Sequence, residues 1–173
     1  MAIPRRVVPI FLTLMALTSA RAGDDRPASP YPHATVRRTV IGSGPRSYVL
    51  FEPDTPRPER APVVVFVHGW LAMNPGVYGA WVDHLVRRGN VVIYPRYMDE
   101  WETPVEAFLP NALAAVVDAL DVLATSPAHV KPDRTRFALV GHSTGGVLAV
   151  QLAALCASRH LPEPRAVVAA TPG

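Results

Sequence analysis

Cysteine is scarce in this sequence: Cys156 is the only one among 173 residues, which excludes an internal disulfide. Because Cys156 lies in an apolar stretch, we expect a buried thiol rather than one paired with another chain. Nucleotide-binding patterns are also missing. There is no P-loop, and GSGPRS at 42–47 lacks the third glycine of a dinucleotide fingerprint and precedes a strand pattern. The histidines, the cysteine and the carboxylates of this sequence do not have the spacing of metal ligands, so we expect neither metal nor cofactor.

The sequence also lacks an excess of positive charge once the predicted signal peptide is removed. Its formal net charge is +3, from 17 basic and 14 acidic side chains. Residues 1–22 have the features of a signal peptide: two arginines, the apolar run VVPIFLTLMALTSA, and an A-x-A cleavage pattern before Gly23. Cleavage would remove three arginines and no acid, leaving equal numbers of basic and acidic groups. This balance predicts neither a nucleic-acid partner nor an anionic membrane surface.

The signal peptide predicts an exported protein, periplasmic or extracellular. Its apolar run is shorter than the roughly 20 residues that span a bilayer, so we expect no stable membrane span after cleavage. An uncleaved anchor is the less favoured alternative. Residues 23–35 are polar and rich in proline, which is typical of a tether. The oligomeric state stays open.

From residue 36 onward, strand and helix patterns alternate. Residues 36–42 and 47–53 predict an antiparallel pair at a sheet edge. Buried strands are expected at 63–67, 90–95 and 136–141, and a further strand at 165–173. Helices are expected at 78–89, 103–125 and 144–160. The alternation predicts an α/β fold over 36–173, with a mainly parallel sheet and helices on both faces.

The long helix predicted at 103–125 begins with a capping pattern and contains a proline. Thr103 is expected as the N-cap, Pro104 as the first helical residue, and Glu106 as the partner in a capping box. Pro110 predicts either a kink or a second helix start, because a proline ring disrupts the preceding turn.

Gly141-His142-Ser143-Thr144-Gly145 matches the pattern G-x-S-x-G. It follows a predicted buried strand and opens a predicted buried helix, which is the context of a nucleophile elbow. Gly141 and Gly145 are expected because a side chain there would collide with the neighbouring strand or helix. Ser143 is expected to have a strained backbone. An ordinary serine N-cap is disfavoured, since it would not require glycine on both sides.

Two motifs, GHSTGG at 141–146 and HGW at 68–70, resemble the α/β-hydrolase family of serine esterases and lipases. The resemblance covers roughly residues 36–173, the N-terminal part of that fold. It implies that Ser143 is the nucleophile and that the backbone N–H groups of Trp70 and Thr144 form the oxyanion hole. Such preorganised donors each contribute ~3 kcal/mol of transition-state stabilisation.

The resemblance also implies roles for two residues before Trp70. Gly69 would allow the backbone to approach the substrate closely. His68 would be structural, because it precedes the oxyanion turn, where the family does not place its base.

The remaining members of a catalytic triad are hard to place in this sequence. Only His160 and Glu163 follow Ser143 as histidine and acid, and both lie beyond a helix of about 15 residues, some 22 Å long. Neither can be a triad member. The favoured interpretation is a sheet cut after its sixth strand, with the triad acid and histidine in missing C-terminal residues. A complete but degenerate chain is the alternative; a weaker idea places the acid at Asp99 and still leaves no histidine.

We therefore expect a serine hydrolase that acts on small-molecule carboxylic esters through an acyl-enzyme on Ser143. Amide cleavage and acyl transfer stay open, because the elbow does not select the leaving group. The chain alone is expected to be inactive. The alternative function is a non-catalytic pseudo-hydrolase or binding protein on the same scaffold.

Overall fold

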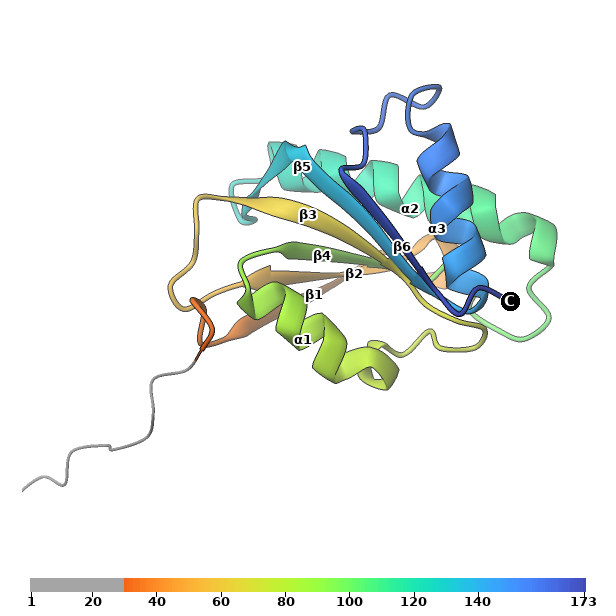
Figure 1. Ribbon diagram of the computed structural model, residues 1–173, viewed down its shortest axis with the longest axis horizontal. Helices are drawn as coiled ribbons and strands as arrows, with labels where there is room; N and C mark the ends of the chain where they lie inside the picture. Colours follow the sequence, from red (N-terminus) through yellow and green to blue (C-terminus); the bar gives the residue numbers. More distant parts are fainter. Residues whose placement is uncertain (1–29) are drawn as a thin grey trace, which may run out of the picture.

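A single six-stranded sheet organises residues 30–173, the part of the chain that the computed structural model describes (Figure 1). Its strands are β1 (Val36–Ile41), β2 (Tyr48–Pro53), β3 (Arg60–Val67), β4 (Val91–Pro95), β5 (Lys131–His142) and β6 (Ala166–Ala170). The helices are η1 (Gly44–Arg46), η2 (Pro75–Tyr78), α1 (Gly79–Arg87), α2 (Val105–Thr125) and α3 (Thr144–Leu155). The predicted signal peptide and most of the predicted tether lie outside the described residues.

The strand order is β1-β2-β4-β3-β5-β6. Strand β3 pairs in parallel with both β4 and β5, and β5 pairs in parallel with β6. Strands β1 and β2 add an antiparallel pair, with β1 at the edge. The mainly parallel α/β sheet and its antiparallel edge pair are therefore confirmed.

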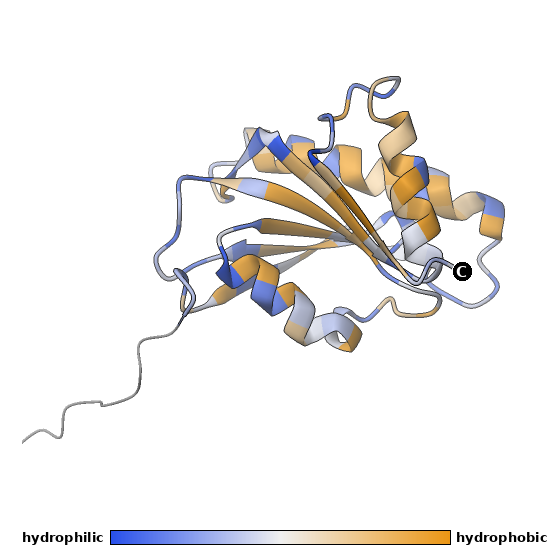
Figure 2. Cartoon of the chain, viewed as in Figure 1, coloured by the Kyte–Doolittle hydropathy of each residue, from blue (hydrophilic) through white to orange (hydrophobic). Residues whose placement is uncertain are grey.

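Helices cover both faces of the sheet, as the sequence predicted. In Figure 1, α1 lies on one face, and α2 and α3 lie on the other. The central strand β3 divides its side chains between the two cores: Val65 and Val67 pack with α2 and α3, whereas Phe66 packs with α1. Figure 2 shows the strands and α3 mostly in the hydrophobic colour. Burial on both faces explains why the β3 sequence is continuously apolar rather than alternating.

The predicted capping box at the start of α2 is wrong. The helix begins at Val105 with Pro104 as its N-cap, and no side chain caps it. Thr103 instead donates its hydroxyl to Asp99 Oδ1 at 3.3 Å. Pro104 has an extended backbone (φ −59°, ψ 137°), which places Thr103 one residue too early to reach the helix N–H groups.

Two further helix predictions change in the structure. Helix α2 continues through Pro110 to Thr125, so Pro110 does not mark a second start. Helix α3 ends at Leu155 rather than near residue 160. Cys156 follows it, buried as predicted, with its thiol 3.3 Å from the carbonyl oxygen of Leu152. Burial raises the pKa of this thiol.

The end of the predicted tether contacts α1. The His33 N–H donates to the carbonyl oxygen of Arg87 at 3.3 Å. The Tyr31 hydroxyl lies 3.0 Å from His84 Nδ1, and the Arg87 guanidinium lies 4.4 Å from the centre of the Tyr31 ring. These contacts attach residues 31–33 to the domain.

Helix α2 is the one helix within residues 30–173 that is long and apolar enough to cross a membrane. Eight of its side chains are buried in the protein, among them Phe108, Leu120 and Leu123. The core helix of a globular domain meets the same two criteria, so α2 is weak evidence for a membrane span. The predicted absence of a stable span stays a prediction.

A buried carboxylate holds together the sheet end opposite Ser143. The Glu52 side chain is 0% exposed and accepts three hydrogen bonds: from Arg37 NH2 at 2.6 Å, His129 Nδ1 at 2.9 Å and the Val130 N–H at 2.7 Å. It thereby joins β1, β2 and the loop that leads into β5. Its partners replace the water that a buried charge loses.

We expect Glu52→Ala to lower the free energy of unfolding by about 3–5 kcal/mol, because it leaves Arg37, His129 and the Val130 N–H without their shared acceptor. Urea unfolding would measure the change. Asp83→Ala is the matched control: it removes a half-exposed carboxylate paired with Arg87 at 3.4 Å and should cost less than about 1 kcal/mol. Equal losses in the two variants would contradict this account of Glu52.

Candidate active site

Ser143 occupies a sharp turn between β5 and α3. Its backbone has φ 53° and ψ −128°, a left-handed conformation that is strained for a residue with a side chain. The Ser143 N–H donates to the carbonyl oxygen of Ala170 at 3.0 Å, which ties the turn to β6. The strained strand-to-helix turn predicted for a nucleophile elbow is therefore present.

The glycines on either side of Ser143 lie where no side chain fits. A Cβ atom at Gly141 would lie closer than 3.0 Å to the backbone of Gly145, in the first turn of α3. A Cβ atom at Gly145 would lie equally close to the carbonyl oxygens of Val67 and His68, at the end of β3. Close packing of the helix start on β3 thus requires both glycines, as the sequence predicted.

The two predicted oxyanion donors line one cavity. Trp70 follows β3, Thr144 opens α3, and both border a cavity of about 460 Å³. The N–H groups in the first turn of a helix have no intrahelical acceptor, so Thr144 is suited to bind an anion. The structure thus brings Trp70 and Thr144 together beside Ser143; their role as donors stays a prediction.

The walls of this cavity are mostly apolar and come from the first turns of α2 and α3. The Trp70 ring packs edge-on against Phe108, with 6.0 Å between ring centres. Two polar side chains, Glu106 and Gln151, also border the cavity. Its apolar lining is completed by Val105, Leu109, Val147 and Leu148.

His68 holds the turn that leads to Trp70. Its Nδ1 lies 2.7 Å from the carbonyl oxygen of Gly69 and its Nε2 2.9 Å from that of Arg96. The ring is fully buried and stacks on Tyr97 at 4.2 Å and Tyr94 at 5.2 Å. Burial lowers the pKa of His68 and favours the neutral ring. These contacts match the structural role expected for His68.

Within residues 30–173, the hydroxyl of Ser143 has no histidine as a hydrogen-bond partner. Four other histidine rings are bonded elsewhere: His33 to the Pro56 carbonyl, His84 to Tyr31, His129 to Glu52, and His142 to Tyr78. His160 lies beyond α3, as expected. Asp99 is exposed and accepts from Thr103, so nothing links it to Ser143.

Sequence reasoning missed two tyrosines behind the site. The Tyr97 hydroxyl donates to the carbonyl oxygen of His68 at 2.8 Å. The Tyr78 hydroxyl lies 3.0 Å from the Gly69 nitrogen and 2.9 Å from His142 Nδ1. Neither tyrosine belongs to a motif, so no local pattern could have indicated these contacts.

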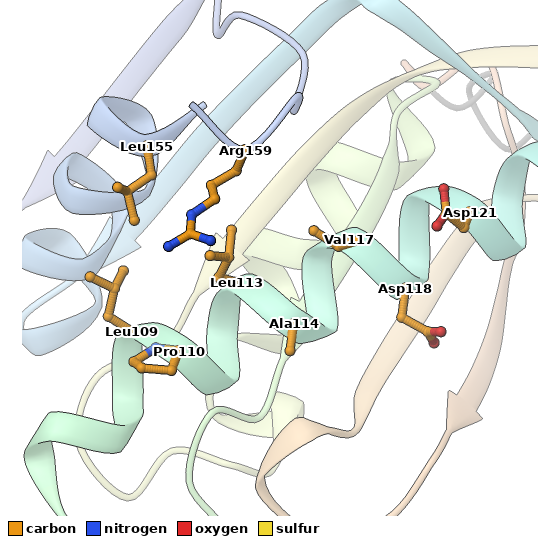
Figure 3. A pocket seen from close by; sticks show the side chains of 9 residues that line it. All are labelled: Leu109, Pro110, Leu113, Ala114, Val117, Asp118, Asp121, Leu155 and Arg159. Atoms are coloured by element: carbon orange, nitrogen blue, oxygen red, sulfur yellow. The ribbon is translucent and has the colours of Figure 1, made fainter. Parts of the chain in front are cut away.

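A second cavity, of about 590 Å³, lies between α2 and α3 (Figure 3). Leu109 and Leu113 line it from α2, Leu155 lines it from the end of α3, and Arg159 lines it from the turn that follows. Neither predicted oxyanion donor borders it. It is therefore not the candidate active site.

The strand order, the strained serine turn and the glycines around it define an α/β-hydrolase fold. A family model described as Chlorophyllase matches residues 31–172, nearly all of the described chain. The chain therefore belongs to the chlorophyllase family of α/β-hydrolases. Among curated proteins, no significant match was found.

Solved structures of esterases share this fold. An arylesterase superposes with a TM-score of 0.63 at 20% identity, over 82% of this chain and 46% of its own. Carboxyl esterase 2 of the fungus Tuber melanosporum superposes with a TM-score of 0.60 at 22% identity, over 77% of this chain and 43% of its own. Brefeldin A esterase, a bacterial homologue of human hormone-sensitive lipase, has a TM-score of 0.58 at 22% identity. The match covers 78% of this chain and 39% of the esterase. This chain thus spans less than half the length of these structures.

We expect Gly145→Ala to destabilise the protein by at least about 3 kcal/mol, because its Cβ atom would meet two backbone carbonyls that cannot move aside. Thermal or urea unfolding would measure the loss. Gly79→Ala is the matched control, since nothing lies within 4 Å of a Cβ atom there. A helix prefers alanine, so this control should be neutral or slightly stabilising. A Gly145→Ala protein as stable as the control would refute the close packing described here.

Proposed function

We propose that the protein is a serine hydrolase that cleaves carboxylic esters through an acyl-enzyme on Ser143. One observation carries the proposal: the strained Ser143 turn stands beside a cavity bordered by both Trp70 and Thr144. A serine hydroxyl next to a space bordered by two residues whose backbone N–H groups could act as donors would suit a carbonyl carbon and its oxygen. The esterase names of the solved structures with this fold support an ester substrate.

The reaction would proceed in two halves. Ser143 Oγ attacks the acyl carbon, its proton passes to a histidine base, and the carbonyl electron pair moves to the oxygen held by the Trp70 and Thr144 N–H groups. The C–O bond to the alcohol then breaks, and the alcohol leaves with the proton from the base. Water attacks the acyl-enzyme in the same way and releases the acid and free Ser143.

The cavity walls favour an apolar group next to the scissile bond. Phe108, Val147 and Leu148 offer hydrocarbon surface, and the Trp70 ring extends it toward the oxyanion turn. Glu106 adds a carboxylate at the border, which repels an anionic substrate. We therefore propose uncharged esters with an apolar acyl or alcohol group as the substrate class.

The histidine base and its acid partner are proposed to come from outside residues 30–173. This proposal follows from the missing histidine partner of Ser143 within the described residues. The same observation supports a second candidate function, a non-catalytic binding protein on the hydrolase scaffold. Activity measurements separate the two.

We expect the intact gene product to hydrolyse p-nitrophenyl butyrate, and Ser143→Ala to reduce kcat at least about 10³-fold without loss of folding. A fluorophosphonate should label Ser143, which mass spectrometry of the digested protein would verify. Turnover that survives Ser143→Ala would refute the proposal. A folded gene product with neither turnover nor labelling would favour the binding protein.

We also expect residues 30–173, expressed alone, to hydrolyse the same ester no faster than their own Ser143→Ala variant, because the hydroxyl lacks a base there. Circular dichroism would establish that both proteins are folded. Turnover by the isolated segment that depends on Ser143 would show that the base lies within it.

A further inference from the structure

The two predicted oxyanion donors follow different strands: Trp70 lies in the loop after β3, and Thr144 is the first residue of α3, after β5. Strands β3 and β5 pair in register as far as Val67 and Gly141. Beyond that pair, the loop after β3 continues through Gly69 to Trp70, whereas β5 ends at His142 and Ser143 leads into α3 at Thr144. The β3–β5 hydrogen bonds therefore do not alone set the separation of the two donors. The packing of Gly145 on the end of β3 contributes, and so do further contacts between the two segments.

A single side-chain atom connects these two segments. The Gly69 N–H donates to the Tyr78 hydroxyl oxygen at 3.0 Å, and the same oxygen lies 2.9 Å from His142 Nδ1. Gly69 directly precedes Trp70, and His142 directly precedes Ser143. Tyr78 thus contacts the backbone one residue before a predicted donor and the side chain one residue before the nucleophile.

The hydrogen-bonding capacity of a tyrosine hydroxyl suits this position. Its oxygen accepts from the Gly69 N–H and can donate its own proton to an unprotonated Nδ1. That arrangement places the His142 ring proton on Nε2. All three groups are then satisfied by one continuous chain of hydrogen bonds.

Tyr78 itself is firmly placed. Its ring packs against Phe66 of β3, with 5.0 Å between ring centres, and against His142 edge-on at 5.7 Å. The short helix η2 that carries it is capped by Asn74, whose side chain accepts from the Gly76 N–H at 3.0 Å. The hydroxyl is therefore presented from a packed core rather than from a loose loop.

The bridge also gives Gly69 a different role from the one expected. A Cβ atom there would lie 3.0 Å from the Tyr78 hydroxyl and 3.3 Å from His142 Nδ1. The nearest neighbours of Gly69 on this side are thus the two bridging groups. The small residue makes room for the bridge, and the close approach of its backbone to a substrate stays a prediction.

We propose that Tyr78 is a positioning residue whose hydroxyl joins the oxyanion loop to the nucleophile elbow and thereby sets the separation of the Trp70 and Thr144 N–H groups. This inference rests on the proposed function for its catalytic consequence. The bridge itself is a property of the fold and can be measured without turnover.

The test is Tyr78→Phe in the intact gene product, which removes the bridging oxygen and keeps the packed ring. Tyr48→Phe is the matched control, because it removes a hydroxyl bonded to Asp118 at 2.7 Å, between β2 and α2. Amide NMR spectra of each variant report the bridge. We expect Tyr78→Phe to shift the Gly69, Trp70 and Thr144 amide signals and Tyr48→Phe to leave them in place.

Ester hydrolysis reports the consequence for catalysis. We expect Tyr78→Phe to lower kcat about tenfold with KM nearly unchanged, because a displaced donor weakens binding of the transition state more than that of the substrate. The Tyr48→Phe protein should keep its kcat. We expect His142→Ala to lower kcat to a similar degree and the double variant to be no worse than either single variant, since both break the same bridge.

Separate outcomes refute separate claims. Unmoved Trp70 and Thr144 signals in Tyr78→Phe overturn the bridge, whatever the turnover. Shifted signals with an unchanged kcat, or a loss confined to KM, overturn the positioning role. An absence of Ser143-dependent hydrolysis in the unaltered protein instead counts against the proposed function, and the NMR comparison then decides the bridge by itself.

Discussion

The candidate site depends on the close contact between the first turn of α3 and the carboxyl end of β3. Gly145 lies against the carbonyl oxygens of Val67 and His68, closer than any side chain would permit. This contact brings the helix start next to the oxyanion loop and forces the backbone through the strained turn at Ser143. Thr144, which directly follows Ser143, consequently borders the same cavity as Trp70.

A layer of buried aromatic side chains supports this contact from behind. His68 is stacked between Tyr94 and Tyr97, and the Tyr97 hydroxyl bonds to the His68 carbonyl. Tyr78 joins the same layer through Phe66. The Tyr97 and Tyr78 hydroxyls supply hydrogen-bond partners to the His68 carbonyl and the Gly69 N–H. The loop before Trp70 is therefore held by several hydrogen bonds at once, which suits a site that must keep its geometry as charge develops.

The described residues contain one half of the proposed chemistry. They hold Ser143, the proposed nucleophile, and the two residues proposed to polarise a carbonyl, and the structure shows no histidine bonded to Ser143 within residues 30–173. The histidine and the acid that would transfer the proton are proposed to lie outside these residues. The chain spans 39–46% of the length of the solved esterase structures that it matches.

Local sequence determined the strand and helix alternation, the elbow glycines and the buried Cys156, because burial periodicity and backbone sterics act over a few residues. The capping pattern at 103–106 gave a wrong prediction because another acceptor competes for the Thr103 hydroxyl, which bonds to Asp99 instead of capping α2. The first residues of β3 and β5 were also missed, because Pro62 and Pro132 are unfavourable in strands. In the structure these residues nonetheless pair with each other. Only the tertiary structure decided how Tyr78 connects Gly69 to His142, since that bridge joins residues 9 and 64 positions apart. The spacing of residues in the sequence does not predict such contacts, because folding brings their partners together from separate elements.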